Sequence, residues 1–200
     1  MTGLSLSGID GDVSIKSLSY NEIKLNDIHA AFRFNGRGML FDPLVFNSLG
    51  GLMTGKAQVT MSSPAQYIIN VYPAGLNLSA IAHDFKFQDK VSLEGALGGR
   101  ITIGGKGAKI NLLNGNLSTE GRGGTVVIND PYILENLARS THQPKEIVIQ
   151  TFKDYHYNKG IVSLSLRKGD LGLNIALDGE KGKRDFQITV HDFNLTKDGL

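Results

Sequence analysis

The chain of 200 residues is long enough to form one or two domains with a sizeable core. Its 40% hydrophobic and 20% charged residues are typical of a folded protein, and 21 basic against 19 acidic side chains leave a net charge of +2, which gives no electrostatic reason to bind nucleic acid. Cysteine is absent, so a disulfide framework, a thiolate zinc site and a cysteine nucleophile are excluded.

The two ends of the sequence show no targeting signal. No segment approaches the ~20 apolar residues that a membrane-spanning helix needs, and the opening MTGLSLSGIDGD lacks the basic region and apolar core of a signal peptide. The chain begins in strand-like alternation and stops at FNLTKDGL without a closing element. We therefore expect a piece of a longer protein whose targeting signals lie outside this sequence.

Alternating apolar and polar residues dominate the N-terminal part and recur along the chain. In DVSIKSLSY (12–20), Val13, Ile15 and either Leu18 or Tyr20 alternate with polar neighbours, and EIKLNDIHAAFRFN continues the pattern. Such alternation predicts half-buried strands. Further strands are expected over 39–46, 52–61, 67–76, 91–103, 109–119, 125–128, 161–166, 171–177 and 184–195.

Short, mostly glycine-rich connections separate these strands. They are NGRG (35–38), LGG (49–51), GGKG (104–107), EGRGG (120–124), RKGD (167–170) and DGEKGK (178–183). Short turns imply antiparallel neighbours, because parallel strands need long crossovers. The expected fold is therefore mainly β, a long twisted antiparallel meander that forms a single domain over 1–200.

The stretch GGRITIGGKG (98–107) superficially resembles a phosphate-binding loop. Such a loop needs glycine, four residues, then Gly-Lys followed by Ser or Thr. Here neither Ile101 nor Arg100 supplies the first glycine, and Gly107 stands where the hydroxyl residue belongs. We expect a short strand, Arg100–Ile103, between two glycine turns, and no bound nucleotide.

Two segments interrupt the strands with helical signals, 76–85 and about 130–157. Ser79 is the expected cap of a short first helix. In the second segment, Asp130 is a suitable cap and Pro131 suits the first helical position, while Pro144 ends or restarts the helix. We therefore predict a helical insertion of two helices joined near Ser140–Gln143, with Tyr155 on the apolar stripe of the second helix.

No catalytic or metal-binding arrangement is visible. No H-x-x-x-H or H-E-x-x-H spacing and no G-x-S-x-G elbow occurs, and the histidines are scattered at His29, His83, His142, His156 and His191. His191 and Asp192 are adjacent on an expected strand, so they point to opposite faces. We expect no metal, no cofactor and no enzymatic activity.

Residues 76–128 carry four motifs in order: a short L-x-L-x-x-I helix, a v-L-x-G-x-L-x-G-x-I-p-I strand pair, an I-x-I-x-x-G-x-L strand and a final strand that starts with glycine. The matching residues are Leu78–Ile81, Leu93, Gly95, Leu97, Gly99, Ile101–Ile103, Ile110, Leu112, Gly115, Leu117 and Gly124–Ile128. This series resembles the C-terminal region of the AsmA-like envelope proteins, and within them the YdbH family, whose C-terminal domain is also labelled dicarboxylate transport. Thr102 departs from the family pattern, which has proline there.

The resemblance implies a sheet curled into an open apolar groove (a β-groove), in which phospholipid acyl chains move between the inner and outer membranes of Gram-negative bacteria. It also implies a place in the periplasm or cell envelope, an inner-membrane anchor outside this segment, and envelope membranes and other envelope proteins as partners. It supplies no catalytic residues. Two alternatives stay open: a structural scaffold or interaction domain of the envelope, and transport of small dicarboxylates, for which the local basic cluster is Arg100, Lys106, Lys109 and Arg122.

The alternation leaves one face of a long sheet apolar, with few helical segments to cover it. Strand parity selects candidates for the residues that line the groove, and ordinary core packing is the alternative role of each. These candidates are Val59, Met61, Ile69, Val71, Ile101, Ile103, Ile110, Leu112, Val126, Ile128, Leu171, Leu173, Ile175 and Leu177.

Overall fold

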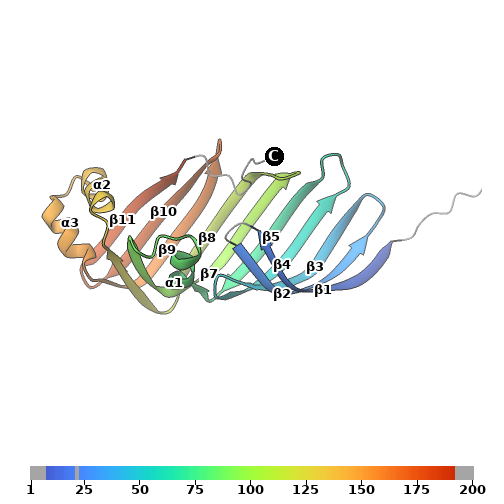
Figure 1. Cartoon of the computed structure of the whole chain (residues 1–200), viewed down its shortest axis with the longest axis horizontal. Coiled ribbons are helices and arrows are strands. Elements are labelled where there is room, and N and C mark those ends of the chain that lie inside the picture. The colour runs from blue at the N-terminus through green and yellow to red at the C-terminus, as the bar shows by residue number, and fades with distance from the viewer. Residues whose placement is uncertain (1–7, 21–22, 192–200) are drawn as a thin grey trace, which may run out of the picture.

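The computed structural model describes residues 8–20 and 23–191, which form an 11-stranded open antiparallel sheet with three short helices (Figure 1). The strands are β1 (Ile9–Tyr20), β2 (Ile23–Phe34), β3 (Gly38–Ser48), β4 (Gly51–Thr60), β5 (Gln66–Ala74), β6 (Leu76–Asn77), β7 (Val91–Lys106), β8 (Lys109–Ile128), β9 (Tyr155–Arg167), β10 (Asp170–Gly179) and β11 (Gly182–Val190). The helices are α1 (Leu78–Asp84), α2 (Pro131–Thr141) and α3 (Lys145–Phe152). The predicted mainly β, antiparallel meander is confirmed.

The strands follow one another across the sheet in the order of the chain. The path is β1-β2-β3-β4-β5-β7-β8-β9-β10-β11, and the two-residue β6 pairs with β7 beside it. Tight turns make this possible: Gly36, Gly50 and Gly169 have positive φ angles between neighbouring strands. β1 and β11 form the two edges of the sheet in the described part of the chain.

The segment EGRGG (120–124) is not the predicted turn. It lies inside β8 as a bulge, because Glu94 and Ala96 on β7 pair with Thr125 and Glu120, which are further apart in sequence. At Gly123, where φ is 91°, a Cβ atom would overlap the carbonyl oxygen of Tyr157 on β9. Glycine here therefore permits close approach of two strands as well as a change of direction.

The stretch 98–107 is likewise mostly strand. β7 is continuous to Lys106, and of the glycines in this stretch Gly107, with φ of 58°, lies in the turn to β8. The prediction of a short strand between two glycine turns was therefore wrong. A Cβ atom at Gly99 would meet the carbonyl oxygen of Asn116 on β8, so that glycine serves contact between strands.

The short helix α1 is capped by a residue other than the predicted one. The Asn77 side chain accepts a hydrogen bond from the backbone N–H of Ala80, as an N-cap does. The Ser79 hydroxyl donates to the carbonyl oxygen of Leu93 at 2.6 Å instead, which ties α1 to β7. Both residue types are good caps, and the alternation does not show at which residue the helix begins.

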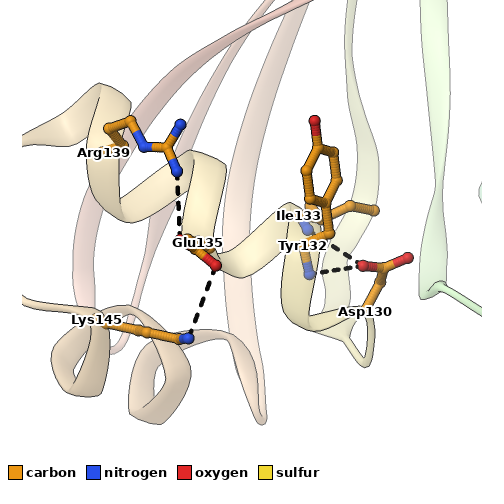
Figure 2. Close-up of polar contacts among 6 residues, drawn as sticks. All are labelled: Asp130, Tyr132, Ile133, Glu135, Arg139 and Lys145. Atoms are coloured by element: carbon orange, nitrogen blue, oxygen red, sulfur yellow. Dashed lines mark hydrogen bonds and ion pairs between the residues drawn. The ribbon is translucent and has the colours of Figure 1, made fainter.

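α2 begins as the sequence predicts, with Pro131 as its first residue. Figure 2 shows the Asp130 carboxylate accepting hydrogen bonds from the backbone N–H groups of Tyr132 and Ile133, at 2.8 and 3.2 Å. Farther along α2, Glu135 lies between Arg139, at 3.3 Å, and Lys145 of α3, at 3.9 Å. The cap fixes the start of α2, and the Glu135–Lys145 ion pair connects the two helices.

α3 is shorter than predicted. It ends at Phe152, and Tyr155 is the first residue of β9 and not part of the helical stripe. Tyr155 is fully buried and its ring packs against Phe152, with ring centroids 5.6 Å apart. Tyr155 therefore packs in the core as expected. The spacing of the apolar residues did not show that the helix ends before it and that a strand begins there.

The main core lies where α2 and α3 pack against the end of the sheet that contains β8 to β11 (Figure 1). Its buried members are Val126, Ile128, Leu134, Leu137, Ala138, Val148, Phe152, Tyr155, Tyr157 and Leu177. A second, smaller cluster of Met53, Leu76, Leu97 and Leu117 lies beneath α1, whose Leu78 and Ile81 pack against it.

Candidate apolar binding face

Strand pairing sorts the side chains of the sheet onto two faces, because residues directly opposite each other in an antiparallel pair point to the same side. One row of paired residues crosses all ten strands of the path. It consists of Val13, Ala30, Leu44, Gly55, Val71, Ile101, Gly115, Leu164, Leu173 and Ile188. We call this the central row and the side on which it lies the apolar face. No polar side chain interrupts the central row.

Neighbouring rows on the same face are also apolar. One row joins β2 to β8 through Phe32, Phe41, Ala57, Ile69, Ile103 and Leu113. Another joins β8 to β11 through Leu117, Val162, Ile175 and Phe186. At a strand spacing of about 4.8 Å, the central row is roughly 43 Å long.

Most predicted groove residues share this face. Strand pairing places there Val59, Ile69, Val71, Ile101, Ile103, Ile110, Leu171, Leu173, Ile175 and Leu177. Val126 and Ile128 also contribute to it, in the part of β8 beyond the bulge, where they are buried in the main core. Leu177 is buried in the same core, so these three residues pack beneath helices in this structure.

Strand parity fails at one predicted groove residue, and a second, Met61, lies outside the strands. Leu112 pairs with Gly104, whose missing side chain leaves room that Leu112 fills, and both lie on the face opposite Ile103. The cause is a bulge, since Gly104 pairs with Leu112 while Gly105 pairs with Ile110. Leu113 occupies the apolar face in its place. Met61 follows the last residue of β4 and is 58% exposed.

The apolar face is uncovered toward the N-terminal edge. In Figure 1, α2 and α3 lie beside β9 to β11, α1 lies near β7, and no helix of the described chain lies over β1 to β3. Ile9 and Ile15 of β1 are both exposed on this face. Leu44, Phe41 and Phe32, on the next two strands, are half-buried. We call β1 to β5 the open half and β8 to β11 with α2 and α3 the covered half.

The opposite face, which we call the polar face, carries hydrogen bonds between strands, and it also exposes the apolar side chains Ile68, Leu112 and Ile161. The Asn70 side-chain oxygen accepts bonds from Thr102 at 2.9 Å and from Arg100 at 3.2 Å. Across the next strands, the Ser163 hydroxyl donates to the side-chain oxygen of Asn116 at 2.8 Å. Contacts of this kind suit a solvated sheet surface.

The predicted basic cluster does not form a single pocket. Arg100 is held by Asn70 and lies over the Tyr72 ring, 5.9 Å from its centroid. Lys106 and Lys109 pair with each other at the end of the β7–β8 hairpin, about 20 Å along the strand from Arg100. Arg122 belongs to the β8 bulge, beyond Arg100 in the other direction.

A carboxylate, an imidazole and a hydroxyl align on the polar face in an order that the sequence did not suggest. Asp154 Oδ1 lies 2.8 Å from His156 Nε2, and His156 Nδ1 lies 3.2 Å from the Thr125 hydroxyl. This is the connectivity of a hydrolytic triad. The His156 and Asp154 side chains are 53% and 61% exposed, however, and lack the exclusion of water that strengthens catalytic hydrogen bonds.

Two further observations concern sites of other kinds. Among the described residues, no group of three or more His, Asp or Glu side chains is placed to hold a metal ion. In the same part of the chain, no helix is both long and apolar enough to cross a membrane.

Burial in the main core raises the pKa of two tyrosine side chains. Burial raises the pKa of the Tyr157 phenol above its ordinary value, and its hydroxyl donates to the carbonyl oxygen of Glu94 at 2.9 Å. Burial also raises the pKa of Tyr155, although the positive charge of Arg184 acts against that increase. Both groups stay neutral near pH 7 and serve as structural donors.

Comparison of the whole chain with models of known families, with curated proteins and with solved structures found no match. The functional conclusion therefore depends on the two faces of the sheet.

Proposed function

We propose that the chain binds phospholipid acyl chains on its apolar face and conducts them along it, as a segment of an AsmA-like periplasmic protein that moves phospholipid between the inner and outer membranes. The observation that carries this proposal is the central row, in which no polar side chain occurs on any of the ten strands of the path. Such a face is also the feature that the resemblance to the YdbH family implies.

The energetic argument concerns the open half. Burying an aliphatic side chain contributes about 1.5–3 kcal/mol, so the aliphatic side chains that stay exposed on this half, Ile9 and Ile15 of β1, favour an apolar occupant. Ala30 and Val71 of the central row are already buried. An acyl chain is a suitable occupant, because one leaflet contributes about half of the ~30 Å bilayer core and the central row is longer than that. The hydrophobic effect is non-directional, so a chain can shift from one strand to the next without breaking specific bonds.

A scaffold or interaction domain of the cell envelope is the second candidate function. The observation that favours it is the pair of edge strands, β1 and β11, which no further strand pairs among residues 8–20 and 23–191, so that another chain could add a strand there. Transport of small dicarboxylates has less support, because Arg100 is engaged with Asn70 and Tyr72, and the other basic side chains of the predicted cluster lie far from it.

Two aliphatic residues on opposite faces of the same hairpin give a matched test. Ile103 lies half-buried on the apolar face of β7, and Leu112 lies 41% exposed on the polar face of β8. We expect I103E to lower the amount of phospholipid that copurifies with the chain by about tenfold, because a carboxylate would replace an apolar contact. L112E should leave it unchanged.

Mass spectrometry of solvent-extracted protein measures the bound lipid, and a thermal melt of each variant monitors folding. Wild-type protein that is folded, monomeric and free of lipid after incubation with phospholipid vesicles would exclude lipid binding and favour the scaffold function. Equal losses in both variants would show that the apolar face is not the binding surface.

A further inference from the structure

Arg184 is the one charged side chain that strand pairing places on the apolar face among the described strand residues. It pairs with Leu177, which is buried in the main core, and the next residues of β11 on the same face are Phe186 and Ile188. Charged residues on the neighbouring positions, Lys183 and Asp185, point to the polar face. A guanidinium therefore stands at the end of an otherwise apolar surface.

No counter-charge is paired with this guanidinium among the described residues. Its Nη1 donates to the carbonyl oxygen of Lys183 at 2.8 Å, and its Nη2 donates to the Thr151 hydroxyl at 3.4 Å. Its Nε is buried and has no hydrogen-bond partner among the described residues. No carboxylate of the described chain forms an ion pair with it.

A partly buried cation with an unpaired donor is unfavourable unless an anion or another acceptor satisfies it. Arginine presents its N–H groups in a planar fork that matches the two oxygens of a carboxylate or a phosphate. Its neighbours on the sheet, Leu177 and Phe186, offer no such group, and the Thr151 hydroxyl that it contacts on α3 is neutral. The missing partner is therefore most simply a ligand oxyanion.

We propose that Arg184 binds the oxyanion, carboxylate or phosphate, of an amphiphile whose acyl chain lies on the apolar face. This inference rests on the proposed function and names its substrate class: anionic, not neutral, lipid. β11 is an edge strand of the described part of the sheet, so the head group can approach Arg184 past that edge. Ile188, which is 41% exposed, belongs to the central row and connects the head-group position with it.

A purely structural role for Arg184 is the competing explanation. Its bond to Thr151 links β11 to the last turn of α3, and a cation near a helix C-terminus is favourable. Lys181 already serves this purpose, however, because its ammonium donates to the carbonyl oxygens of Gln150 and Asp154. Arg184 fits this structural role less well, because its contact with the Thr151 hydroxyl is 3.4 Å long and its Nε has no hydrogen-bond partner.

The test compares three probes of equal chain length, dodecanoate, dodecyl phosphate and dodecyl maltoside, with inorganic phosphate as a fourth. Binding is measured by isothermal titration calorimetry below the critical micelle concentrations at pH 8, where the carboxylate is ionised. The proteins are wild type, R184Q and the control K183Q, which removes a neighbouring positive charge from the polar face. A thermal melt accompanies each variant.

We expect R184Q to weaken binding of both anionic probes by about tenfold, the effect of one charge-assisted hydrogen bond, and to leave the maltoside unchanged. K183Q should bind all probes as wild type does. Equal affinities of wild type and R184Q for the anionic probes would overturn the inference, as would a loss that extends equally to the maltoside. Phosphate that binds as tightly as dodecyl phosphate would show a free-anion site. Failure of every amphiphile to bind wild type would overturn the proposed function itself.

Discussion

The two halves of the sheet differ in what covers their apolar face. In the covered half, Val126, Ile128 and Leu177 are buried because α2 and α3 pack on them. In the open half, equivalent positions such as Phe32 and Phe41 stay half-buried, although their rings contact each other at 6.4 Å between centroids. One continuous apolar face is thus covered by α2 and α3 at one end, whereas at the other end Ala30 and Val71 are buried without those helices and exposure is greatest along β1. Stability and binding are expected to separate along it.

The largest expected effect comes from removing an aromatic side chain from each half. F152A deletes a ring that packs against both Tyr155 and Phe186, so we expect a loss of about 3–5 kcal/mol in the free energy of unfolding. F41A removes a half-buried ring and should cost clearly less, while it reduces lipid binding. Urea unfolding measures both, and equal losses of stability would mean that the open half is packed as tightly as the covered half.

The sequence predicted the fold class and most of the apolar face, because period-two alternation reports directly which side chains share a side. It failed where the period is interrupted. The bulge beside Gly104 places Leu112 on the opposite face from the predicted one. The bulge around Gly123 lies within β8, where a connection between strands was expected. Both depend on close contact with a neighbouring strand, which a single segment does not reveal.

The predicted end of the second helix was wrong for a similar reason. Asp130 and Pro131 are specific start signals, so the beginning of α2 was predictable. Tyr155 is apolar enough to continue the helical stripe, and only its partner Val126 on β8 makes it a strand residue. Arg184 gave no signal either, since its place on the apolar face follows from register with Leu177.

Alkaline pH should lower the stability of the covered half, because two buried tyrosines lie in its core. Tyr155 and Tyr157 have pKa values raised above 10.0 by burial, so they stay neutral in the folded state where the unfolded chain would ionise. The free energy of unfolding is therefore expected to be steady below pH 10 and to fall as the pH rises through the folded-state pKa values. In Y157F this fall should be smaller, whereas Y132F, which alters an exposed tyrosine, should behave as wild type.

Unfolding followed by urea titration between pH 8 and 11 measures this dependence. The substitution also removes the hydrogen bond from the Tyr157 hydroxyl to Glu94, so Y157F starts from a lower stability at pH 8, and the slope against pH is the quantity to compare. Identical slopes in Y157F and wild type would show that this phenol does not titrate with unfolding.

The smallest expected effect comes from removing the N-cap of α2, which leaves the residues of the sheet unchanged. D130A removes the carboxylate that accepts from the Tyr132 and Ile133 N–H groups, and we expect a loss of about 1 kcal/mol in stability. The control E135Q removes one exposed partner of Arg139 and Lys145 and should cost no more than about 0.5 kcal/mol. Hydrogen exchange resolves where the loss falls. Faster exchange in D130A confined to α2, α3 and the strands beneath them would separate the two halves energetically, since the core beneath α2 and α3 contains no residue of β1 to β5. Faster exchange throughout β1 to β5 would mean that the sheet unfolds as one unit and that the difference between the halves is one of exposure alone.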